Sequence, residues 1–253
     1  MQRNVYLDMY RGFSLVSMAA FHGYYDLVFV FGFWPHYLGS SLYNIWQQTI
    51  VLSFIFIAGG STCYSKKLWR HGVQLELLGL AITLVTMLVL PSELIIFGVL
   101  SFLGTSLLLL VPFQKKLTGL NTTPLRLQAL AVLCVVGFGL TQGLSRGYIG
   151  LYGWRLLDLS SSYVSVLSFS VGLPTQGIIS ADYVPLLPHF FIFLLGRVLW
   201  QYHLLGGATG EQKIFFSSRL AQPFIWLGRH SLGFYLVHQI ILYGICKIIG
   251  LFR

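Results

Sequence analysis

Residues 11–26 read RGFSLVSMAAFHGYYD, and this stretch decides the fold class of the chain. Most of its positions are apolar or small, as the hydrocarbon interior of a bilayer requires of a helix. Yet Arg11 opens the stretch, His22 lies in its middle and Asp26 follows four residues later. Ionisable groups inside a membrane helix are costly, and they usually face a partner or a cavity. The stretch therefore predicts a membrane helix with a polar, functional face.

The composition extends this prediction to the whole chain. Of 253 residues, 56% are hydrophobic and only 9% are charged, which is far less charge than a soluble domain carries. Apolar stretches of roughly 18 to 25 residues recur, each long enough to cross a bilayer. We expect an all-α polytopic membrane helix bundle that forms one integral-membrane domain over residues 1–253. The seven expected spans are 12–32, 44–63, 73–91, 94–113, 127–144, 185–203 and 224–249.

The net charge of +9 is explained by topology rather than by a nucleic-acid partner. With the N-terminus in the cytoplasm, most lysines and arginines between the spans fall on the cytoplasmic side, as the positive-inside rule requires. An odd number of spans then places the C-terminus outside. The cations on the inner side are Arg3, Arg11, Lys66, Lys67, Arg70, Lys115, Lys116, Arg126, Lys213 and Arg219.

The first span carries its polar groups on one face. Arg11 and His22 are eleven residues apart, which is three helical turns plus about 20°. The i,i+4 spacing of His22 and Asp26 lets the carboxylate bond one imidazole nitrogen and leave the other as a general base. Two structural alternatives stay open. Arg11 can be an interfacial anchor, and the His–Asp pair can join two helices.

Further polar groups lie near the other end of the chain. Tyr235 and His238 share a helical face of the last expected span, and the helix rise places His238 at a depth similar to His22. They are candidate acceptor contacts, or they bond a neighbouring helix. Arg197 and Arg229 lie towards the cytoplasmic side, where they are candidate phosphate ligands or snorkelling anchors. No third ligand joins His22 and Asp26, so we predict no metal site.

The longest segment outside the expected spans is 145–184. It is compatible with a lid, a re-entrant segment or a plain connector. Its stretch YVSVLSFSVGL, residues 163–173, is apolar enough to touch the membrane without spanning it.

Several stretches together resemble a known family. The pattern LDMYRGFSLVSMAAFH at 7–22 is similar to the first helix of the acyltransferase-three membrane proteins, and closer to the catalytic domain of heparan-α-glucosaminide N-acetyltransferase and its bacterial relatives. Four more stretches resemble that catalytic domain in the same order. They are FIFIAGGSTCYS (54–65), FGVLSFLGTSLLLL (97–110), LPHFFIFLLGRVL (187–199) and WLGRHSLGFYLVHQIIL (226–242).

The resemblance implies a multi-pass acyltransferase of the bacterial cytoplasmic membrane. It would take an acyl group, usually acetyl, from cytoplasmic acetyl-CoA and pass it to a glycan or amino sugar on the far side. Arg11 would lie on the acyl-CoA path, and His22 would be the catalytic histidine. The lysosomal members carry their catalytic histidine in the following loop, where this chain has His36. We favour His22, because Asp26 can orient it.

Other functions stay open at this stage. A small proton-coupled transporter would also keep histidine, aspartate and arginine inside its helices. A protein that binds acyl-CoA or another ligand without catalysis fits the same residues. The sequence is compatible with a monomer and with a homodimer.

Overall fold

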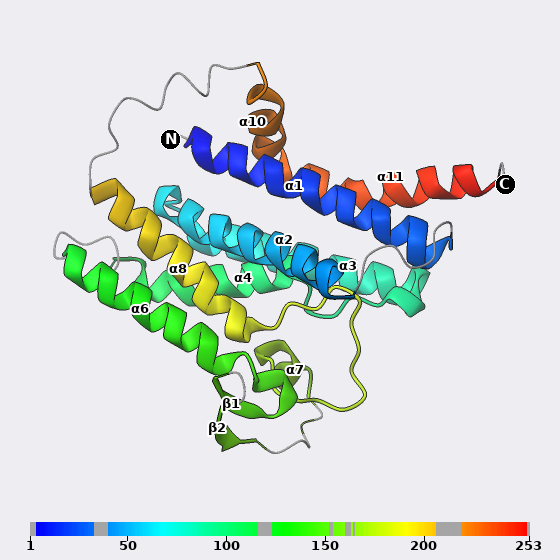
Figure 1. Cartoon of the computed structure of the whole chain (residues 1–253). Coiled ribbons are helices and arrows are strands. Elements are labelled where there is room, and N and C mark those ends of the chain that lie inside the picture. Colours follow the sequence, from blue (N-terminus) through cyan, green and yellow to red (C-terminus); the bar gives the residue numbers. More distant parts are fainter. Residues whose placement is uncertain are drawn as a thin grey trace. The chain divides into compact units, whose positions relative to one another are not determined.

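A computed structural model describes residues 4–32, 40–115, 123–151, 154–159, 163, 165–205 and 219–251 of the chain. These residues are mostly helical (Figure 1). The chain divides into two compact units, 1–57 with 208–253 and then 58–207, and the boundary lies within helix α2. Each unit is described by itself.

The first unit begins with helix α1 (Val5–Tyr25). The side chain of Asn4 caps this helix by accepting hydrogen bonds from the backbone N–H groups of Tyr6 and Leu7, at 2.9 and 3.3 Å. Such a cap satisfies two of the N–H groups that a helix start leaves without partners. The helix continues into a π-helical turn, η1 (Asp26–Val30). Single π turns are rare in proteins overall, but those that occur are often found at functional sites.

The last expected span, 224–249, is wrong as a continuous helix. The structure has α10 (Gln222–Arg229) and α11 (Ser231–Leu251), and the backbone leaves helical geometry at His230. Figure 1 shows α10 turned away from the line of α11. Apolar periodicity on both sides of His230 concealed the break, because hydropathy reports membrane affinity and not the continuity of a helix.

Helices α1 and α10 cross in backbone contact at two glycines. A Cβ atom added to Gly228 would lie 1.7 Å from the carbonyl oxygen of Asp8, and one added to Gly12 would lie 1.9 Å from that of Phe224. Only a residue without a side chain fits at either position. The crossing therefore fixes α10 against the first two turns of α1.

The core of this unit lies between α1 and α2, on the turns of α1 that precede His22. Leu15, Met18 and Phe21 of α1 pack with Ile50 of α2 (Ser40–Ser61). The indole N–H of Trp46 donates to Ser17 at 3.0 Å, so α2 is also held to α1 by a polar bond. The aromatic and aliphatic side chains that surround this core are Tyr43, Trp46, Phe54, Leu227, Phe234 and Tyr235.

The second unit contains the remaining helices and a small sheet. Its long helices are α3 (Leu68–Val89), α6 (Pro124–Thr141) and α8 (Leu186–Leu205), with α4 (Val99–Leu110) packed against α3. Short 3₁₀ turns, η2 (Thr62–Tyr64), η3 (Pro91–Glu93), η4 (Val111–Phe113) and η5 (Leu144–Arg146), separate the elements. The sheet has two antiparallel strands, β1 (Tyr148–Leu151) and β2 (Trp154–Asp158).

The 145–184 segment, for which the sequence left three forms open, is folded over its described residues. It contains the β1–β2 hairpin and helix α7 (Val166–Val171). The ring of Tyr183 stacks on Phe169 at 4.0 Å, and its hydroxyl donates to the Phe169 carbonyl. Burial raises the pKa of Tyr183 to about 12. The segment thus has a small core of its own, while its role stays a prediction.

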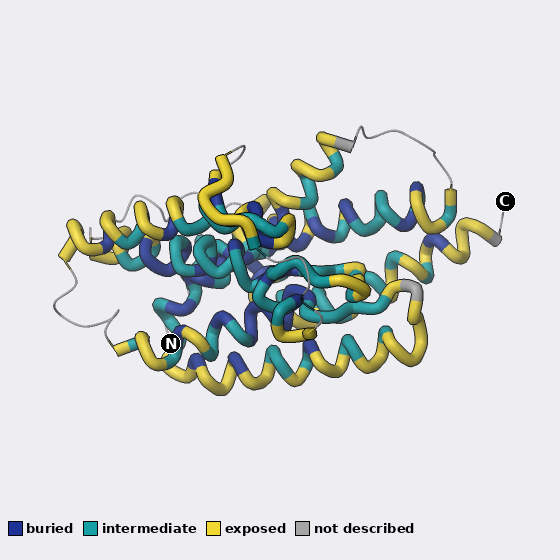
Figure 2. The backbone as a smooth tube through the Cα atoms, turned by 90° about the horizontal axis from the view of Figure 1, so that it is seen from below, coloured by how far each residue is buried: buried dark blue, intermediate teal, exposed yellow. Residues whose placement is uncertain are grey.

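Among the residues that the structure describes, five helices are long and apolar enough to cross a membrane, and they agree with five of the seven expected spans. They are Val5–Val30, Ser41–Tyr64, Leu68–Val89, Pro124–Arg146 and Ser231–Gly250. Exposed residues recur along the long helices in Figure 2, as lipid contact requires. The expected span at 94–113 corresponds to a shorter apolar helix, Val99–Phe113. The count of seven, like the side on which the N-terminus lies, stays a prediction.

Candidate active site

Two histidines from opposite ends of the chain meet in the first unit. The ring centroids of His22 on α1 and His238 on α11 are 5.2 Å apart, with their planes inclined by 55°. The sequence placed both imidazoles at one depth, and the structure brings them side by side. His238 is buried. A pair of imidazoles in a largely apolar setting is suited to receiving and returning a proton.

The tautomer of His238 is set by the backbone. Its Nδ1 lies 2.6 Å from the carbonyl oxygen of Tyr235, three residues earlier on α11. A carbonyl oxygen can only accept, so Nδ1 carries the proton in the neutral ring. Nε2 then carries the lone pair. His238 therefore has a fixed orientation and one basic nitrogen.

Aromatic side chains enclose the histidine pair. Phe21 meets the ring of His22 edge-on at 5.8 Å. Phe234 stacks on His238 at 6.0 Å, and the ring of Tyr235 lies 5.7 Å from it. These contacts limit the rotation of both imidazoles. Tyr235, a candidate acceptor contact, is partly buried against the core and also supplies the carbonyl that orients His238.

Asp26 is bonded by a residue that the sequence analysis missed. The side-chain amide of Gln239 donates to both carboxylate oxygens of Asp26, at 3.1 and 3.3 Å. Asp26 is only 1% exposed. This bond ties the end of α1 to α11 next to His238. The i,i+4 spacing suggested an aspartate that bonds His22 directly, but a helical spacing cannot reveal a donor that lies 213 residues away.

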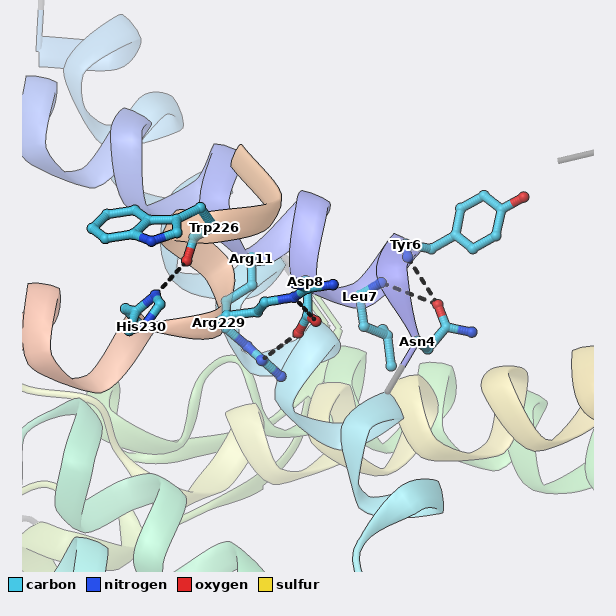
Figure 3. Close-up of polar contacts among 8 residues, drawn as sticks. All are labelled: Asn4, Tyr6, Leu7, Asp8, Arg11, Trp226, Arg229 and His230. Carbon is cyan, nitrogen blue, oxygen red and sulfur yellow. Dashed lines mark hydrogen bonds and ion pairs between the residues drawn. The ribbon is translucent and has the colours of Figure 1, made fainter. Parts of the chain in front are cut away.

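Two of the three arginines that were candidate phosphate ligands converge on one carboxylate. Arg11 lies 3.5 Å from Asp8 on the same helix, and Arg229 of α10 reaches the other Asp8 oxygen at 3.6 Å. Figure 3 shows both guanidinium groups directed at Asp8. Asp8 is buried, whereas the side chain of Arg229 is 45% exposed. Two guanidinium groups and one carboxylate leave an excess of positive charge at this end of α1.

Arg197 lies on α8 in the second unit. Its side chain is 1% exposed and donates to the hydroxyl of Thr62 at 2.8 Å. The Thr62 hydroxyl in turn donates to the carbonyl of Gly59 near the end of α2. A cation at a helix C-terminus is stabilised by the helix dipole. These contacts support a role in holding α8 to the end of α2, while the role of Arg197 in donor binding stays a prediction.

His36 lies outside the described residues. Among the described residues, no group of three or more His, Cys, Asp or Glu side chains could hold a metal ion.

A family model for the catalytic part of heparan-alpha-glucosaminide N-acetyltransferase matches residues 3–240. The chain belongs to this family. The match confirms the resemblance drawn from the sequence. Together with the apolar helices it establishes a multi-pass membrane protein of an acetyltransferase family. Comparison with curated proteins and comparison with solved structures each return no match.

The matched range includes the groups that the structure brings together. Asp8, Arg11, His22 and Asp26 lie near its start, and the arginine and histidine groups of α10 and α11 lie near its end. The heparan-alpha-glucosaminide N-acetyltransferase match therefore covers both ends of the candidate site.

Proposed function

We propose that the protein transfers an acetyl group from acetyl-CoA on the cytoplasmic side to a hydroxyl or amine of a glycan or amino sugar on the far side of the membrane. Family membership supports acetyl transfer. The observation that carries the proposal is the pair of the partly buried His22 and the buried His238, 5.2 Å apart on two helices that have the length and composition of membrane spans.

The chemistry requires one proton acceptor. In the proposed step, His22 takes the proton from the acceptor O–H or N–H as that atom attacks the thioester carbonyl. A bond forms between the acceptor and the carbonyl carbon, the C–S bond breaks, and the departing CoA thiolate takes the proton back. General-base assistance of this kind contributes typically ~10²–10⁴-fold. His238 and Tyr235 would hold the acceptor beside His22, and Asp26 would act through Gln239.

The donor is proposed to bind by its phosphates at Arg11 and Arg229. Guanidinium groups bind phosphate in a fork geometry, and Asp8 holds both of them in place. Because the three side chains keep an excess of positive charge, an anionic group can join them without displacing Asp8.

The test measures donor binding and transfer separately. Acetyl-CoA should raise the melting temperature of the detergent-solubilised protein, because it binds the folded state. Arg11→Ala should weaken that shift. His22→Ala should keep the shift and abolish transfer of labelled acetyl to a panel of amino sugars and glycans, and His36→Ala should keep both.

Two alternatives are separated by the same experiments. A proton-coupled transporter would show no melting shift with acetyl-CoA. A protein that only binds the donor would show the shift and no transfer by the unsubstituted chain. An inactive His36→Ala beside an active His22→Ala would move the chemistry into the segment between α1 and α2.

The setting is part of the proposal. We place the protein in the bacterial cytoplasmic membrane, as a monomer or a homodimer, with the N-terminus in the cytoplasm. The bias of lysine and arginine in the sequence supports this orientation.

A further inference from the structure

The β1–β2 hairpin exposes apolar side chains directly after a candidate membrane span. Trp154 is 77% exposed, and Leu151 and Leu157 are 55% and 56% exposed. All five residues of β2 are exposed. A two-stranded hairpin is marginal by itself in water, and an exposed apolar edge strand promotes aggregation. This hairpin therefore requires a partner surface.

A bulge sorts the side chains of the hairpin onto two faces. Ile149 pairs with Leu157 and Gly150 with Arg155, so the pairing passes over Leu156. Paired residues of antiparallel strands share a face, and a bulge shifts the alternation by one residue. Trp154 and Leu157 are thereby placed on the apolar face, together with their partners Leu151 and Ile149.

The opposite face is polar, and its contacts agree with this assignment. Arg155 lies over the ring of Tyr148 at 5.1 Å and pairs with Asp158 at 3.6 Å. Tyr148 is the register partner of Asp158. The Arg155 and Asp158 side chains are 66% and 73% exposed. The hairpin is thus amphipathic although the sequence of β2 does not alternate.

The apolar face continues a stripe on α6. A methyl group added to Gly139 would lie 3.0 Å from the side chain of Leu151, so β1 touches α6 there. Val132 and Val136, seven and three residues before Gly139 on the same helical face, are exposed. In a membrane protein these valines face lipid. The hairpin therefore extends a lipid-facing surface.

The length of the span places the hairpin at the membrane surface. The candidate span Pro124–Arg146 has 23 residues, of which α6 contributes 18, or about 27 Å of α-helix, close to a hydrocarbon thickness of about 30 Å. Gly147 alone separates Arg146 from β1. Tryptophan is enriched at this depth, and the open edge of β2 can hydrogen-bond there to water and headgroups.

We propose that the β1–β2 hairpin lies in the headgroup layer of the bilayer, with Trp154 and Leu157 directed at the acyl chains and Arg155 and Asp158 directed at water. The hairpin is an interfacial anchor that fixes the depth of α6. This proposal is independent of the catalytic function.

The experiment places an environment-sensitive fluorophore on one cysteine at a time. Trp154→Cys and Leu157→Cys test the apolar face, and Arg155→Cys and Asp158→Cys are matched controls on the same strand. Each full-length variant is reconstituted into vesicles that contain lipids with a nitroxide close to the headgroup. We expect a loss of fluorescence at the first two positions and little loss at the controls. The unsubstituted chain gives the background from Cys63, Cys134 and Cys246.

Three outcomes would overturn the proposal. One is an equal loss at all four positions, and another is no loss at 154 and 157. The third is shielding of those positions that depends on protein concentration, since this would assign the face to a second copy of the chain. Because the substituted side chains are exposed, the variants should keep the melting temperature of the unsubstituted protein, which is checked first.

Discussion

At the scale of single residues, the Asp26–Gln239 bond determines how the histidines meet. Gln239 follows His238 directly, and Asp26 lies one turn after His22. The bond therefore fixes α11 against α1 at the level of the two imidazoles. Since Asp26 is buried, its carboxylate requires hydrogen-bond donors such as the Gln239 amide.

We predict that Gln239→Leu lowers the free energy of unfolding by about 1–3 kcal/mol, the usual cost of removing a hydrogen bond from a buried acceptor. It should also reduce transfer, because the histidine pair loses its alignment. Ile240→Leu, at the exposed neighbouring position, is the control and should change neither quantity. Denaturant titration in detergent measures the loss.

A double-mutant cycle with Asp26→Leu shows whether the two residues act on each other. The double variant should lose less stability than the sum of the single losses. Additive losses would contradict the coupling.

At the scale of elements, the glycine contacts between α1 and α10 position the arginines. Gly228 immediately precedes Arg229, and its close approach to the backbone of Asp8 brings the guanidinium within 3.6 Å of the carboxylate. The short helix α10 is thus held at the end that carries Arg229.

Gly228→Ala should therefore lower the melting temperature and weaken the acetyl-CoA shift, because the added methyl forces α10 away from α1. Gly233→Ala on α11 is the matched control, since no atom lies within 4 Å of the added methyl. It should be neutral or stabilising, by up to about 1 kcal/mol from helix propensity. Equal losses in the two variants would contradict the packing argument.

At the scale of the whole molecule, the open question is the path of the chain through the membrane. In the described part of the chain five helices qualify as spans by length and composition, while α4 with η4 is shorter. Helix α8 has enough residues, but its polar side chains, Arg197 among them, lower its hydropathy. Five and seven are both odd, so both counts place the termini on opposite sides.

We predict that the N-terminus is cytoplasmic and the C-terminus is outside. With seven spans, cysteines introduced at Lys66 and Arg155 should react with a membrane-impermeant reagent from opposite sides in oriented vesicles, whereas with five spans they react from the same side. A C-terminal reporter that is active only in the cytoplasm would contradict the prediction.

The sequence predicted the helical membrane class and the family, because both depend on composition and on motifs in order along the chain. It also placed His22 and His238 at one depth, because a helix converts residue number into distance. It could not find the contacts between elements. Asp8 joins Arg11 to Arg229, and Gln239 joins Asp26, over separations that no spacing encodes. The catalytic and binding roles of these residues stay predictions.

Because the chain leaves helical geometry at His230, Arg229 on α10 and His238 on α11 belong to separate helices. A change in the direction of α10 moves Arg229, while His238 keeps the carbonyl that orients it, since Tyr235 lies on its own helix. Under the proposed roles of Arg229 and His238, preference for the donor and preference for the acceptor would then diverge independently during evolution. A mutant library aimed at longer acyl donors would be placed in α10 and the first turns of α1, and a library aimed at new acceptors around residues 234–239.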